Sequence, residues 1–90
     1  MLVTIALRMP TTATGRQLSK RLSSSLAALG IRKLDALAKR AVVRSRAEGE
    51  LLRTSVAIDY EDALKLRRAA DKAGCGVQTI VRQMGQEGLL

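Results

Sequence analysis

The same order of elements, a short strand, a helix, a glycine and a second helix, occurs twice in this chain of 90 residues. The second copy is the clearer one. Residues 53–59 alternate apolar with small or polar side chains, which is typical of a half-buried strand. Asp59 stands where a helix N-cap belongs, and Gly74 ends the following helical pattern as a C′ glycine. A second helix is then predicted to start at Gly76 or Val77.

The first half of the chain repeats this order. Alternation over residues 3–7 predicts a strand, and leucines at helical spacing then predict a helix that Gly30 closes. A second apolar stripe over residues 34–41 predicts another helix. We therefore expect a single domain, 1–90, made of two repeats: residues 1–45, a linker over 46–52, and residues 53–90.

A single short strand leaves its backbone unpaired and its apolar face uncovered, so the two strands are expected to pair with each other. Antiparallel pairing of residues 2–8 with 53–59 directs one face toward the helices: Val3, Ile5, Leu7, Val56 and Ile58. The other face is directed outward: Leu2, Thr4, Ala6, Arg53, Ser55 and Ala57. The expected fold is α+β and mostly helical, a monomer in which two repeats form a pseudo-dimer with a two-stranded antiparallel ribbon on four helices.

Charge and composition narrow the function. The net charge is +8, and residues 1–45 carry nine basic residues against one acid. A compact basic surface attracts a polyanion, most commonly nucleic acid. The chain has no His and one Cys, so a disulfide scaffold and a His/Cys zinc site are excluded, and no cofactor is expected. The apolar start lacks the features of a signal peptide and no segment has the length of a membrane span, so a cytoplasmic protein is predicted.

The strand, helix, glycine and helix of the second half resemble the ribbon-helix-helix DNA-binding family, which includes the Arc, MetJ and CopG repressors. Residues 53–59 (RTSVAID) match its ribbon, and residues 74–81 (GCGVQTIV) match its turn into the second helix. Two copies in one chain resemble the tandem form seen in the overdrive-binding virulence protein of T-DNA transfer. That protein also has a proline-containing loop after its first strand, as residues 9–15 have here.

The resemblance implies two groups of DNA-contacting residues. Outward side chains of the ribbon would read bases in the major groove, which has a distinct pattern for each base pair: Thr4, Ala6, Arg53, Ser55 and Ala57. Helix N-termini, with their free N–H groups, would hold phosphates: Ile31, Arg32 and Lys33 in the first copy, and Gly76, Val77 and Gln78 in the second. Arg8 would reach the groove or a phosphate. Arg53 is the one predicted base reader able to make a two-pronged contact with guanine.

The expected function is therefore double-stranded DNA binding without catalysis, because the chain offers no catalytic constellation. The resemblance implies an accessory factor in relaxosome-type DNA transfer (conjugation), with a relaxase or other transfer protein as partner, or a transcription regulator of a plasmid or other mobile element. Two alternatives remain open. One is an antitoxin-type protein whose tail wraps a partner, and the other is a helical adaptor whose basic helices bind an acidic protein.

Overall fold

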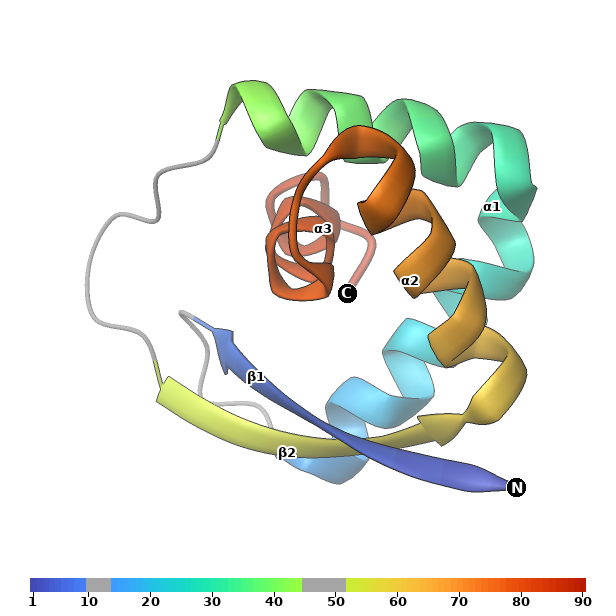
Figure 1. Cartoon of the computed structure of the whole chain (residues 1–90). Helices are drawn as coiled ribbons and strands as arrows, with labels where there is room; N and C mark the ends of the chain where they lie inside the picture. Colours follow the sequence, from blue (N-terminus) through green and yellow to red (C-terminus); the bar gives the residue numbers. More distant parts are fainter. Residues whose placement is uncertain (10–13, 45–51) are drawn as a thin grey trace.

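The computed structural model describes residues 1–9, 14–44 and 52–90, which form two strands and three helices. Strand β1 (Leu2–Met9) is followed by the long helix α1 (Gly15–Val43). Strand β2 (Leu52–Asp59) leads directly into α2 (Tyr60–Ala73), and α3 (Val77–Gln86) ends the order. The two strands cross the lower part of Figure 1, and the three helices form a layer over one side of them. Of the predicted linker over 46–52, residues 46–51 lie outside the described residues, and residue 52 begins β2.

Local sequence signals explain where the helices begin and end. Thr14 caps α1 through a capping box with Gln17, in which each side chain accepts a hydrogen bond from the other residue's backbone N–H. Asp59 occupies the N-cap position of α2, as predicted, but makes no side-chain capping hydrogen bond. Gly74 has a φ of 74°, the left-handed conformation predicted for a C′ glycine.

The expected number of helices is wrong. Gly30 has a φ of 70°, so the backbone does deviate where a turn was predicted, but the chain returns to helical geometry at the next residue. Gly74, in contrast, is followed by Cys75 and Gly76 before α3 begins, so α2 and α3 are separate helices. The described structure has one two-stranded sheet and three helices, with α1 kinked at Gly30. The predicted pseudo-dimer of two ribbon-helix-helix repeats on four helices is therefore overturned.

The antiparallel pairing of the two strands is confirmed. Their register runs from Leu2 opposite Asp59 to Met9 opposite Leu52, with Ile5 opposite Val56. Leu7, Val56 and Ile58 are buried against the helices, and Val3 and Ile5 are packed at the margin of the same core. The strand alternation therefore directs one face of the ribbon inward, as predicted. Most of the remaining core comes from the helices: Leu18, Leu22, Leu26, Leu34, Leu37, Ala38, Leu66, Ala69, Ala70, Ile80, Val81 and Met84.

Polar contacts fasten the second half of α1 to the elements around it. The Arg40 guanidinium forms a two-pronged ion pair with Glu87, with N···O distances of 2.7 and 3.0 Å. Lys72 of α2 lies 3.3 Å from the Asp35 carboxylate. Although it is kinked, α1 is thus held against both α2 and the end of α3.

Candidate nucleic-acid interface

The outward face of the ribbon consists of small and basic side chains. Thr4, Ala6, Ser55 and Ala57 occupy its middle and are all exposed, and so is Arg53 at one end. The structure therefore brings all five predicted base-reading residues onto one surface. Small side chains let a ribbon approach a surface closely along its whole length. The major groove of DNA, about 12 Å wide, admits a two-stranded ribbon of this kind.

Arg8 belongs to this face and lies directly opposite Arg53 in the register. The backbone N–H of Arg8 donates to Gln78 rather than to β2, so Arg8 and Arg53 form a non-hydrogen-bonded pair. The side chains of such pairs lie close together, with Cα atoms about 4.5 Å apart. Like charges directly opposite each other destabilise a sheet. Neither arginine forms an ion pair within the described part of the chain, so one end of the ribbon presents two positive charges to a ligand.

The beginning of α3 flanks the ribbon on the β1 side. The Gln78 Oε1 atom accepts the hydrogen bond from the Arg8 backbone N–H at 3.1 Å. Gly76 is the N-cap of α3 and is exposed, and no side chain caps this helix. The N-terminus formed by Gly76, Val77 and Gln78 therefore lies beside the ribbon, where the phosphate-binding prediction requires it.

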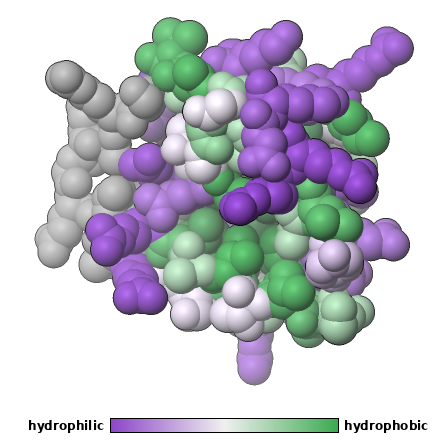
Figure 2. All heavy atoms as spheres, viewed as in Figure 1, coloured by the Kyte–Doolittle hydropathy of each residue, from purple (hydrophilic) through white to green (hydrophobic). Residues whose placement is uncertain are grey.

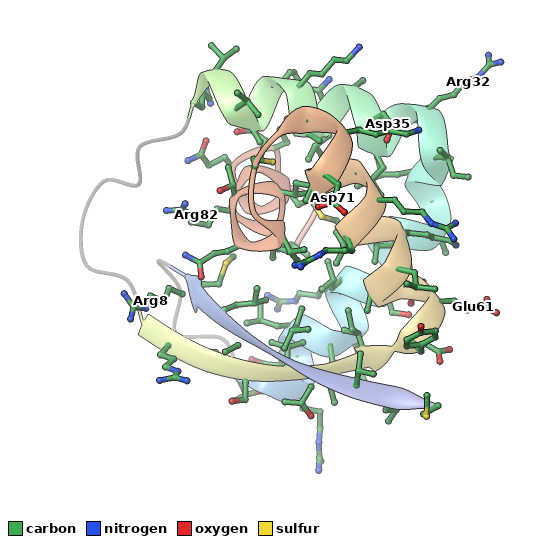
Figure 3. All side chains as sticks on the ribbon, in the orientation of Figure 1. Arg8, Arg32, Asp35, Glu61, Asp71 and Arg82 are labelled. Atoms are coloured by element: carbon green, nitrogen blue, oxygen red, sulfur yellow. The ribbon has the colours of Figure 1, made fainter. Side chains whose placement is uncertain are left out.

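The corresponding group after Gly30 is placed differently. Ile31, Arg32 and Lys33 are exposed at the kink of α1. Arg32 extends from the upper right of the molecule in Figure 3, across the helical layer from both strands. The structure does not bring these three residues to the ribbon. The reason is that α1 continues through Gly30 without the loop that would turn a new helix start toward β2.

The first turns of α1 instead flank β2, which the sequence did not suggest. The Ser19 hydroxyl donates to the Ala57 carbonyl oxygen, and Gly15 packs against the Ser55 carbonyl. Arg16 and Lys20 each follow one of these contact positions by a single residue, about 100° around the helix. Both are exposed and project from the side of α1 opposite its core leucines. The signal that could have revealed them is the Thr14–Gln17 capping box, which sets the start of the helix.

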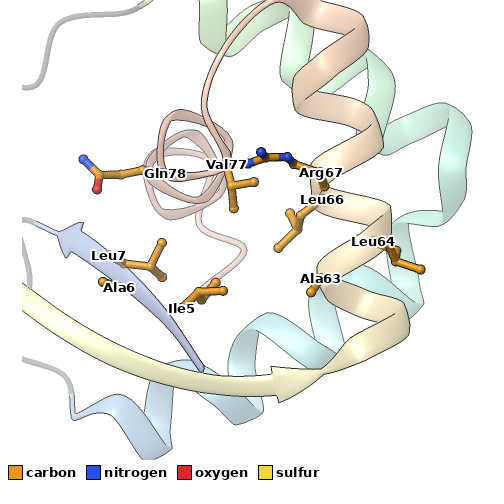
Figure 4. Close-up of a pocket in the computed structure, with 9 residues that line it drawn as sticks. All are labelled: Ile5, Ala6, Leu7, Ala63, Leu64, Leu66, Arg67, Val77 and Gln78. Carbon is orange, nitrogen blue, oxygen red and sulfur yellow. The ribbon is translucent and has the colours of Figure 1, made fainter. Parts of the chain in front are cut away.

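The described part of the chain also contains an apolar cavity and a cysteine. A mostly apolar cavity of about 320 Å³ lies behind the ribbon, between β1, α2 and α3. Figure 4 shows Arg67 and Gln78 at the margin of this cavity. Figure 2 shows hydrophobic atoms gathered in the middle of the face that is turned toward the viewer. Cys75 is half-buried, and the loss of hydration raises the pKa of its thiol. Among the described residues there is no cluster of potential metal ligands, and no helix is long and apolar enough to cross a membrane.

Comparison with known proteins yields no relative: the chain matches no protein family, no curated protein sequence and no solved structure. Function must therefore be inferred from the surface itself.

Proposed function

We propose that this protein binds double-stranded DNA by inserting the outward face of the β1–β2 ribbon into the major groove. The observation that supports this most directly is the composition of that face. It has small side chains in its middle, a pair of arginines with no acidic partner among the described residues at one end, and beside it a helix N-terminus that no described side chain caps. These are the groups that contact base edges and phosphates.

Groups that can bind phosphates on both sides of the ribbon support the same proposal. The α3 N-terminus lies beside β1, and the exposed Arg16 and Lys20 lie on the first turns of α1, which contact β2 through Gly15 and Ser19. A ribbon in the groove has a sugar-phosphate backbone on each side. Both backbones then meet positive charge or backbone N–H groups, which fix the position of the protein without reading sequence. The net charge of +8 adds long-range attraction that depends on salt.

The biological part of the proposal comes from the resemblance of β2, α2 and α3 to the ribbon-helix-helix family. It is that of a cytoplasmic, non-enzymatic DNA-binding protein that assists DNA transfer beside a relaxase or represses a promoter of a mobile element. An antitoxin-type or adaptor protein would use its surface to bind a protein instead. The DNA-binding proposal and the protein-binding alternative predict different results. A negative charge on the outward face of the ribbon should weaken duplex binding only if that face contacts DNA.

Ala57→Glu tests this difference. Ala57 is exposed in the middle of the outward face, so a carboxylate there would enter the groove and meet the negative potential of DNA. We expect affinity for duplex DNA, measured by fluorescence anisotropy, to fall by tenfold or more. Ala36→Glu is the matched control, because Ala36 is exposed on the second half of α1 and the charge change is the same. Equal affinity losses in the two variants would show that the ribbon is not the DNA-binding surface.

A further inference from the structure

The two ends of the outward face are chemically different. At one end Arg8 lies opposite Arg53, and at the other Leu2 lies opposite Asp59. Leu2 is 70% exposed, and the Asp59 carboxylate is 3.6 Å from the N-terminal ammonium. Among the described residues, one end therefore carries two cations, whereas the other combines an apolar side chain with an acid that is paired with the N-terminal ammonium. A surface of this kind has no twofold symmetry in its chemistry.

We infer that Arg8 and Arg53 act together as a specificity element that reads two neighbouring guanines at one end of the binding site. DNA binding by this protein is then directional, with a non-palindromic preferred sequence. The inference rests on the proposed function, and it concerns which bases are read and in which orientation. It also assigns Arg8 to the base-reading group, whereas the family resemblance left it to contact either the groove or a phosphate.

The geometry of the pair suits this role. An arginine fork donates two hydrogen bonds to the O6 and N7 atoms of one guanine, so two forks take two bases. The Cα atoms of such a pair are about 4.5 Å apart, and neighbouring bases along a strand are separated by about 3.4 Å. Flexible arginine side chains can adjust for this small difference. The contact between Gln78 and the Arg8 backbone fixes β1 against α3, so this end of the ribbon is held in place before DNA arrives.

The opposite end favours different bases. Leu2 can contact the methyl group of thymine, and the Asp59 carboxylate can accept a hydrogen bond from the N4 amino group of cytosine. Neither side chain can form the two-pronged contact with guanine. Reversing the protein on its site would place Leu2 and Asp59 against the guanines, and binding in that orientation would be weaker.

The test is selection of bound duplexes from a pool with a randomised central segment, carried out with the full chain. The expected result is an asymmetric site with two adjacent guanines at one end. Arg8→Ala and Arg53→Ala should each abolish the preference at one of these positions, with about 5- to 150-fold weaker binding to the selected duplex. Arg53→Gln should change the preferred base at the position that Arg53 reads from guanine toward adenine, because Gln pairs with the N6 and N7 atoms of adenine. Such a shift cannot arise from a loss of folding.

Arg32→Ala is the matched control, since it removes the same charge from an exposed position away from the ribbon. It should leave every base preference unchanged. A palindromic selected site, or arginine variants that weaken all duplexes equally without changing any preference, would overturn the inference and leave DNA binding intact. Failure of the unmodified protein to bind any duplex in the pool would overturn the proposed function itself.

Discussion

Gly15, the first residue of α1, packs against the backbone carbonyl of Ser55 in β2 so closely that a Cβ atom at this position would overlap the carbonyl oxygen. Four residues later, Ser19 donates a hydrogen bond to the Ala57 carbonyl on the same strand. These contacts cover the edge of β2 that does not pair with β1. Unpaired strand edges are templates for aggregation, and a helix that covers one removes this hazard.

Gly15→Ala should therefore destabilise the fold. The overlap is with backbone, which cannot rotate aside, so the start of α1 must shift away from β2. Overpacking of this kind costs about 1–3 kcal/mol, measured as the change in the free energy of unfolding in urea.

Gly85→Ala is the control for the Gly15 variant. Gly85 lies within α3, and a Cβ there would make ordinary contacts with Met9 and Leu90 at 3.8 and 3.9 Å. Alanine is the better helix former by about 1 kcal/mol, so this variant should be more stable than the parent protein. If Gly15→Ala is equally stabilised, α1 does not pack against β2 as described.

The Arg40–Glu87 ion pair should make stability depend on pH in the acidic range. The hydrogen bonds from Arg40 and then Gln83 hold the pKa of Glu87 below its ordinary value of 4.5. A group whose pKa is lowered by folding stabilises the fold when ionised, so this contribution is complete above about pH 4.5 and is lost as the pH falls through the folded pKa. Glu87→Gln should lower the Tm by a few degrees near neutral pH and by less in acid, as followed by circular dichroism.

Glu61→Gln is the comparison for this pH effect. Glu61 is an exposed acid in the first turn of α2, and it forms no ion pair with the other described residues. Its replacement should change the Tm much less than Glu87→Gln does near neutral pH. If Glu87→Gln lowers the Tm by the same amount at all pH values, the cause is poor packing of the Gln side chain and not the loss of charge.

The sequence was most informative where a pattern is local. The alternation of β2, the N-cap position of Asp59 and the glycine turn at Gly74 could all be predicted directly, and so could the pairing of the strands. The sequence could not show whether Gly30 ends a helix or only bends it. A glycine at positive φ fits both outcomes, and packing of the following segment through Leu34 and Leu37 decides between them.

The site could be predicted in part, for a related reason. The residues on the outward face follow from strand alternation alone. The exact register, in which Arg8 lies opposite Arg53, depends on contacts far apart in the chain. The position of Arg32 likewise depends on the path of α1 beyond Gly30, which no local pattern encodes.

Two substitutions at Gln78 should distinguish its contribution to fold stability from its contribution to DNA affinity. Gln78→Leu removes the acceptor for the Arg8 N–H and should lower the Tm, because the β1 edge is no longer joined to α3 by this hydrogen bond. Gln78→Glu retains an acceptor and adds a negative charge at a helix N-terminus, which stabilises the helix. The same charge would repel DNA phosphates. We expect Gln78→Glu to have an unchanged or higher Tm with weaker duplex binding, and equal duplex affinity in Gln78→Glu and the parent would show that the α3 N-terminus does not face DNA.

The last prediction concerns which basic residues of α1 contact phosphates. Arg16 and Lys20 lie on the first turns of α1, which contact β2 through Gly15 and Ser19, whereas Arg32 and Lys33 lie at the kink. Each phosphate that is neutralised releases counterions and adds about 0.9 to the slope of log affinity against log salt. The double variant Arg16→Ala/Lys20→Ala should flatten this slope by about 0.9 for each phosphate that is no longer neutralised, whereas Arg32→Ala/Lys33→Ala should leave the slope nearly unchanged. Both variants remove two positive charges, so long-range attraction falls equally in both, and the difference between the slopes reports direct phosphate binding. A flatter slope for the Arg32/Lys33 variant alone would show that DNA is bound at the kink of α1. It would favour the phosphate-binding role that the family resemblance implies for Arg32 and Lys33.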